Sequence, residues 1–236
     1  LWVGAPLFQP LIVSVLRMTV QLLFIGFYLQ WVFEWNQWWL NLLWLLVMAA
    51  VADASVVSGC GVKARRFAAP LFLGLLAGTA LPLFYCMAVI LRRPNWFDAR
   101  HFIPLAGMIM GNCLRANIVG LSDFYKGVKT REKAFQLALA QGARLSEALR
   151  PHFAGALKAA LQPTIATMAT IGLVSLPGMM TGVMLGGAAP MTAIKYQIAI
   201  MIAIYTGTAI TVSMVIALTI RTSFTRYGIL DRSIYS

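Results

Sequence analysis

Long apolar stretches separated by short polar segments run through almost the whole chain. Each stretch has about 20 residues, the length that an α-helix needs to cross a hydrocarbon core of about 30 Å. They predict six membrane-spanning helices, at residues 11–33, 38–57, 68–91, 102–121, 163–185 and 198–220. Residues 122–162 form the one long polar segment between two spans. We therefore expect an all-α, polytopic bundle in which residues 1–236 make a single transmembrane domain.

Composition places the chain in the same class. Hydrophobic residues make up 60% of its 236 positions and charged residues only 11%, whereas about a quarter of a soluble domain is charged. The mean hydropathy is +0.79. A chain this apolar cannot cover itself with polar surface, so lipid is its expected solvent. The three cysteines and two histidines show no metal-ligand spacing, and neither a disulfide nor a zinc framework is expected.

The basic residues predict the orientation of the bundle. Of the 19 lysines and arginines, 13 belong to segments that six spans place on one side. They occur in the loop 58–66, in the stretch from Lys126 to Lys158, and in the C-terminal tail at Arg221, Arg226 and Arg232. The opposite side has four, at Arg92, Arg93, Arg100 and Lys195. By the positive-inside rule, the loops 58–66 and 122–162 and the C-terminus are cytoplasmic. The net charge of +12 is thus explained by topology, and no nucleic-acid partner is expected.

The segment 131–150, REKAFQLALAQGARLSEALR, is amphipathic. Its apolar positions recur at helical spacing: Phe135, Leu139, Gly142, Leu145 and Leu149. We expect short helices at the membrane surface, broken at Gly142 and at Pro151. Periodicity alone leaves two interpretations open, because such a helix can bind a protein partner or simply lie in the lipid interface.

Four runs of this sequence resemble transporter motifs. The run QLALAQGA at 136–143 is similar to the EAA-type coupling motif of ABC transporter permeases, with Gln136 where that motif has a glutamate. The runs IPLAGMIMGN at 103–112, GLVSLPGMMTG at 172–182 and AIKYQ at 193–197 resemble signatures of one permease family. That family includes a bacterial iron-export permease and plant aluminium-tolerance permeases. Its members have an additional helix before the first span, and this chain begins at Leu1 rather than Met, so seven spans are expected in the complete protein.

The resemblance implies a transport subunit rather than an enzyme. Such a permease pairs with a second copy of itself and with two ABC ATPase subunits, which carry ATP and Mg²⁺; the permease itself has no cofactor. In agreement, the chain lacks the G-x-x-x-x-G-K-[ST] phosphate-binding loop. The implied location is a bacterial inner membrane, with a plant plasma membrane or endomembrane as the alternative.

The resemblance also assigns the ATPase-coupling residues. They are Phe135, Gln136, Leu139, Gly142, Ala143, Arg144, Leu145 and Glu147. Gly142→Pro, or charge reversal at Arg144 and Glu147, is expected to uncouple transport and leave membrane insertion intact.

The span 163–185 contains helix-breaking residues. Pro177 is expected to unwind it near Ser175, and backbone unwound at membrane depth is tolerated only inside protein or beside a wet cavity. We therefore expect a pathway or gate element, with a packing kink as the alternative. Its candidate residues are Ser175, Pro177, Gly178, Met179, Met180 and Gly182, joined by Met108, Asn112 and Arg115 of the fourth span. The methionines could bind a soft metal or fill gaps in packing, and Arg115 could instead extend to the membrane surface.

The remaining charges within the spans bear on the substrate. Arg17 and Asp53 are expected to form an intramembrane pair. Hard cations prefer carboxylate oxygens, yet the spans offer only Asp53, with Glu34 at a rim. Export of an iron-like metal ion or metal-related substrate is therefore implied by resemblance alone, while the residues favour an anionic, chelated or amphipathic small molecule. A channel or secondary carrier without an ATPase, and a membrane anchor without transport, remain alternatives.

Overall fold

The computed structural model describes residues 8–35, 37–90, 97–225 and 229–230. The basic residues Arg92, Arg93, Arg226 and Arg232 lie outside these ranges. The described chain is almost entirely helical and contains no β-strand, only two isolated bridges. Its helices are α1 (Phe8–Trp35), α2 (Trp38–Cys60), α3 (Ala64–Tyr85) with the π-helical turn η1 (Cys86–Ile90), α4 (Ala99–Thr130), α5 (Glu132–Ala140), α6 (Leu145–Thr170), α7 (Gly178–Leu185) and α8 (Pro190–Ser223). The expected all-α fold is confirmed.

Five of the described helices, α1, α2, α3 with η1, α4 and α8, are long and apolar enough to cross a membrane. They correspond to five of the six expected spans. The expected span 163–185 is not one continuous helix, because α6 ends at Thr170 and the short α7 begins only at Gly178. The fourth span is longer than expected: α4 continues past residue 121 to Thr130.

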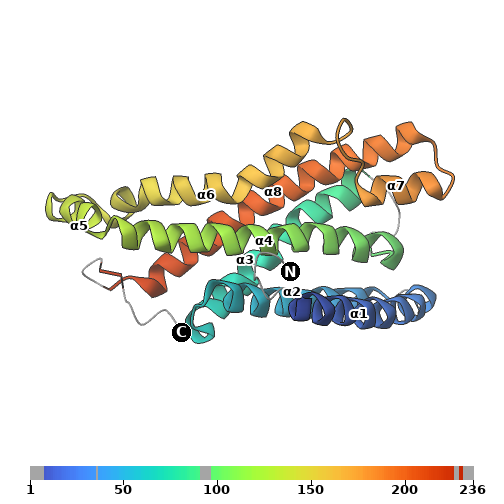
Figure 1. Ribbon diagram of the computed structural model, residues 1–236, viewed down its shortest axis with the longest axis horizontal. Coiled ribbons are helices and arrows are strands. Elements are labelled where there is room, and N and C mark those ends of the chain that lie inside the picture. Colours follow the sequence, from blue (N-terminus) through green and yellow to red (C-terminus); the bar gives the residue numbers. More distant parts are fainter. Residues whose placement is uncertain (1–7, 36, 91–96, 226–228, 231–236) are drawn as a thin grey trace.

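The expected break at Pro151 is wrong. Pro151 and Pro163 both lie inside α6, which begins at Leu145 and continues to Thr170. A proline within a helix removes one backbone hydrogen bond and bends the axis, but packing against neighbouring helices can retain the helical path. Figure 1 shows α6 bending partway along its length.

The helices pass back and forth along the long axis of the molecule (Figure 1). Helix α5 lies at one end and α7 lies toward the other. Three segments that are distant in sequence meet at the α5 end, where Val62 of the α2–α3 connection, Phe135 of α5 and Leu230 of the C-terminal segment belong to one hydrophobic cluster. These are the segments that the basic residues placed on one side of the membrane.

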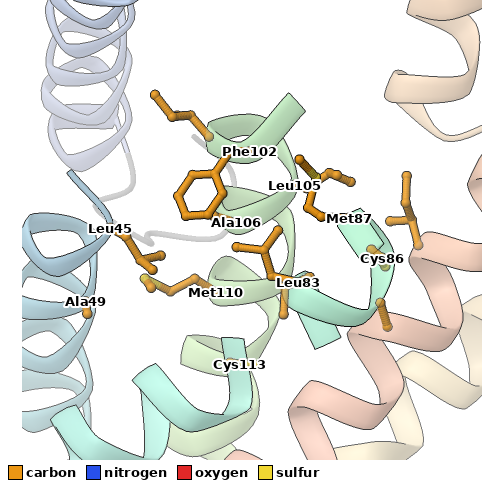
Figure 2. Packing of buried hydrophobic residues seen from close by; sticks show 14 of the residues in the cluster. Leu45, Ala49, Leu83, Cys86, Met87, Phe102, Leu105, Ala106, Met110 and Cys113 are labelled. Atoms are coloured by element: carbon orange, nitrogen blue, oxygen red, sulfur yellow. The ribbon is translucent and has the colours of Figure 1, made fainter. Parts of the chain in front are cut away.

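A second hydrophobic cluster fills the other half of the bundle. Figure 2 shows Leu45 of α2, Leu83 of α3 and Met110 of α4 converging on a common interior. All three side chains are buried. The two clusters hold α2, α3, α4 and α8 together along most of their length.

Glycines bring α3 and α8 into backbone contact. A Cβ atom on Gly207 would collide with the carbonyl oxygen of Gly78, and one on Gly78 would lie 2.7 Å from the carbonyl oxygen of Gly207. Gly74 and Gly78 are spaced four apart, which is typical of close helix crossings in membranes, where packing rather than hydrophobic burial drives association. The small residues of the third span therefore allow packing and do not break its helix.

Buried polar groups join α4 to α8. The Asn117 amide nitrogen donates to Thr211 Oγ1 at 3.0 Å and to the Cys113 carbonyl at 2.8 Å. Nearer the α5 end, the hydroxyls of Tyr125 and Ser223 lie 2.8 Å apart in a hydrogen bond. These bonds fix the register of the two longest helices, which line the candidate site described next.

Candidate transport pathway and coupling surface

A cavity of about 370 Å³ lies between α4, α6, α8 and the start of α7. Six of the nine residues expected to form a pathway or gate line it: Met108, Asn112, Arg115, Pro177, Gly178 and Met179. The first three are spaced four and three apart on α4, which places them on one helical face. The structure thus brings the fourth span and the interrupted segment together around one space.

The interruption itself occurs where the sequence predicted it. Residues 171–177 are non-helical between α6 and α7. Gly172 has a φ of +86°, a conformation that side-chain-bearing residues rarely adopt, and its amide nitrogen donates to the Ser175 carbonyl at 2.9 Å. Pro177 is extended and precedes the first turn of α7. Unwinding near Ser175 is confirmed, and it places Pro177 at the cavity wall.

The other three pathway candidates lie apart from this cavity. Ser175 is exposed in the interruption, and Gly182 is exposed on α7, where a Cβ atom would have no neighbour within 4 Å. Met180 is buried and lines a separate, mostly apolar groove of about 490 Å³ between α6 and α8. The regularly spaced glycines of α7 therefore make no close contact with another helix within the described chain.

The cavity is cationic. Arg115 is exposed on α4, and its side chain makes no hydrogen bond or ion pair with any part of the chain that the structure describes. None of the described lining residues is Asp or Glu. Across the described residues there is also no group of three or more His, Cys, Asp or Glu side chains that could hold a metal ion.

Gln197 of α8 is a further polar residue of the cavity. The residue is only 8% exposed, and its side chain has no hydrogen-bond partner among the described residues. It lies at the wall shared by the cavity and the apolar groove. The sequence contained a signal for it, because Gln197 directly precedes the last apolar span, but sequence reasoning treated it only as part of a motif and not as a site residue.

A second cavity, of about 280 Å³, continues from the first toward the N-terminal end of α4. Arg100 and His101 line it, and His101 Nδ1 lies 3.2 Å from the Asp98 carboxylate. Met179 of α7 and Ile200 of α8 line both cavities. These two side chains therefore lie between two cavities that follow one another along α4.

At the opposite end, α5 and the start of α6 form an angled pair. The expected break at Gly142 is confirmed, since Gly142 has a φ of +93° between the two helices. The Arg144 amide then donates to Glu147 Oε2 at 2.8 Å, a cap that starts α6. The bend is thus built from the glycine and the cap together.

Phe135 attaches α5 to the bundle. Its side chain is buried, its ring meets His152 of α6 edge-on at 6.5 Å, and it packs against Phe224 at 5.9 Å. The other coupling candidates divide by exposure. Leu139, Ala143 and Leu145 are half-buried, whereas Gln136, Gly142, Arg144 and Glu147 are exposed.

Leu137 is a further exposed residue of the candidate coupling surface, and it was not among the coupling residues expected from the sequence. It is 58% exposed on the outer side of α5 and lies within the run that resembles the coupling motif. Helical spacing directs Phe135 inward, and a residue two positions away points to a different side. The expected pair of Arg17 and Asp53 does not form: Arg17 is exposed on α1, and no ion pair joins it to Asp53 in the described chain.

Comparison with known proteins identifies the family. The family described as "Uncharacterised protein family (UPF0014)" matches residues 1–224 of the chain. The chain belongs to the UPF0014 family. No solved structure shows a significant match to it.

Curated relatives in the UPF0014 family come from bacteria and plants. A UPF0014 membrane protein of a Synechocystis strain is 32% identical over 200 residues, covering 85% of this chain and 77% of the relative. The protein ALUMINUM SENSITIVE 3 of Arabidopsis thaliana is 34% identical over 192 residues, covering 81% and 68%. An Escherichia coli protein named "Probable iron export permease protein FetB" is 32% identical over 185 residues, covering 78% and 70%. The resemblance inferred from the motifs is confirmed, and the chain is an integral membrane protein of this family.

Proposed function

We propose that this UPF0014 protein is the membrane-spanning permease subunit of an ATP-driven ABC transporter. It works as an exporter, as two copies with two ATPase subunits that bind ATP and Mg²⁺, and its cargo is an iron-like metal ion or a metal-related compound. The name of the Escherichia coli relative supports the transport class. The observation that carries the proposal is the attachment of the exposed helix α5 to the bundle through buried Phe135.

This attachment suits the transmission of force. A helix that only lay in the lipid interface would not need a buried aromatic anchor, whereas a coupling helix must move together with the spans it controls. Phe135 joins α5 to α6 and to the end of α8, and α4 leads directly into α5. The cavity around Arg115 lies between these same helices α4, α6 and α8. Closure of an ATPase dimer against α5 would therefore shift the walls of the cavity.

The charge distribution supports a cytoplasmic location for α5. The segment from Lys126 to Lys158 carries seven basic residues, and the basic α2–α3 connection lies at the same end of the molecule. The orientation agrees with the positive-inside rule and would place α5 where a cytoplasmic ATPase can reach it. Leu137 would then enter an apolar pocket of the ATPase, with Gln136 and Arg144 at the rim.

Leu137→Asp tests the proposal. Glu147 is a poorer choice because it caps α6, so its substitution would disturb folding as well as docking. Leu137 is 58% exposed and anchors nothing in the described chain. A carboxylate placed in an apolar interface costs affinity, so we expect Leu137→Asp to abolish co-purification with the ATPase and stimulation of ATP hydrolysis. Ile229→Asp is the matched control, because Ile229 is 49% exposed at the same end but lies off α5.

Other outcomes of these experiments would favour the alternative functions. Wild-type chain that transports without an ATPase would be a channel or secondary carrier. Chain that binds a cytoplasmic protein without any transport would be an anchor. Unchanged ATPase binding in Leu137→Asp would show that α5 is not the docking element.

A further inference from the structure

The cavity around Arg115 carries chemistry that points to a class of ligand. It contains an arginine and a buried glutamine that have no partner among the described residues, and none of its described lining residues is a carboxylate. An unpaired guanidinium on a membrane-spanning helix marks a functional position by default. The amide of Gln197 likewise has free hydrogen-bonding capacity at the cavity wall. Both groups can be satisfied by a ligand that accepts hydrogen bonds and carries negative charge.

We propose that this cavity binds an anionic oxygen group, a carboxylate or phosphate, of a small organic molecule or of its metal chelate. The proposal rests on the transport function proposed above and assigns the form of its cargo. Arg115 supplies the positive charge and a fork of donors that suits a planar carboxylate or a phosphate. Gln197 would donate from its amide on α8, and Thr164 of α6 lines the third side.

Cavity size agrees with a small molecule rather than a single ion. Small-molecule sites in proteins have volumes of about 300–1,000 Å³, and this cavity has about 370 Å³. A bare Fe²⁺ would instead need several oxygen ligands in a compact shell, and the described wall offers it a repelling cation in place of a carboxylate. A metal that passes through this site would therefore travel within an anionic complex.

The second cavity extends the same argument. Its described lining contains Arg100 and no Asp or Glu. An arginine thus lines each cavity, Met179 and Ile200 lie between them, and an anion leaving one would meet an arginine in the next. The thioethers of Met108, Met179 and Met201 provide an apolar wall for the organic part of the ligand.

Binding measured on the full chain in lipid nanodiscs, without any ATPase, tests the proposal. The probes are citrate, ferric citrate, glucose 6-phosphate, Fe²⁺ alone and Ag⁺ alone. We expect at least one anionic probe to bind saturably. Neither Fe²⁺ alone nor Ag⁺ alone should bind in this way. Citrate against ferric citrate distinguishes the free anion from its chelate, and glucose 6-phosphate reports on phosphate.

Three variants assign the binding to the cavity. Arg115→Gln should weaken anion binding about tenfold or more, as expected for loss of a charged hydrogen bond, and Arg115→Lys should be intermediate, because it keeps the charge and loses the fork of donors. Arg17→Gln is the matched control, because Arg17 is an exposed arginine of another span that lines neither cavity. It should leave the affinity unchanged.

Several results would overturn the proposal. They are failure of every anionic probe to bind, equal affinity in wild type and Arg115→Gln, and saturable binding of Fe²⁺ or Ag⁺ alone. The second result would indicate that Arg115 only extends to the membrane surface. Because no ATPase is present, loss of anion binding is separable from loss of coupling, which is measured by co-purification of Leu137→Asp.

Discussion

The ring of Phe135 meets the imidazole of His152 edge-on, with centroids 6.5 Å apart and planes at 77°. This contact connects the exposed helix α5 to α6, whose far half lines the central cavity. Because α6 is one continuous helix, the contact links α5 to the wall of the central cavity.

Phe135→Ala should detach α5 while the spanning helices remain folded. Truncation of a buried phenylalanine typically costs about 3–5 kcal/mol, and here the loss falls on a nine-residue helix with few other anchors. We expect lower ATPase stimulation with normal membrane insertion, and faster hydrogen exchange in residues 132–140. Phe27→Ala is the control, since Phe27 is 76% exposed on α1. Unchanged exchange in α5 would contradict the anchoring role.

The same contact should depend on pH. Partial burial, and then the charge of Arg131, lower the pKa of His152 from its ordinary value of 6.5. The state in which α5 is packed against α6 therefore prefers neutral imidazole. The free energy that His152 contributes to this packing is fully present above pH 6.5. It declines as pH falls through that value toward the lowered pKa, because the state with α5 detached then takes up a proton more readily.

Hydrogen exchange of α5 between pH 8 and pH 5, corrected for intrinsic rates, would measure this decline. His152→Gln should make protection independent of pH. His101→Gln should leave the dependence intact, because His101 lies at the other end beside Asp98. If protection of α5 from exchange increased as the pH fell, the predicted direction of the pH dependence would be contradicted.

Gly207→Val should destabilise the bundle at the crossing of α3 and α8. The added side chain would collide with the carbonyl oxygen of Gly78, and overpacking of this kind typically costs about 1–3 kcal/mol. Thermal unfolding in detergent should show a lower midpoint. Gly111→Ala tests the specificity, because nothing lies within 4 Å of a side chain at Gly111. Equal midpoints for the two variants would count against the close crossing.

Met179→Trp should obstruct passage between the two cavities. Met179 and Ile200 line both spaces, and an indole at position 179 would fill the junction. We expect transport to fall severalfold in vesicles while ATPase binding is retained. Met191→Trp, at a 63% exposed position near the start of α8, should transport normally. Full transport by Met179→Trp would place the pathway elsewhere.

Local sequence chemistry was sufficient for several elements. The spans predicted at 11–33, 38–57 and 198–220 agree within a few residues with α1, α2 and the core of α8. A long apolar run in lipid must pair its backbone polar groups within itself, and it therefore forms a helix. The bend at Gly142 and the unwinding before Pro177 also followed from single residues. The predicted helix break at Pro151 was wrong, because whether a proline ends a helix depends on the packing around it and not on the proline alone.

The sequence by itself determined the solvent, the helical class, the end of the bundle at which the basic loops meet, and the residue types available for function. It could not decide which side chains face one another. Only the tertiary structure showed that Arg115, Gln197 and Met179, from three helices, share one cavity, that Arg17 and Asp53 do not pair, and that Phe135 points inward while Leu137 points out. Hydropathy records how a residue partitions between water and lipid, whereas a site depends on the rotation and register of neighbouring helices, which packing contacts such as Gly78 against Gly207 establish.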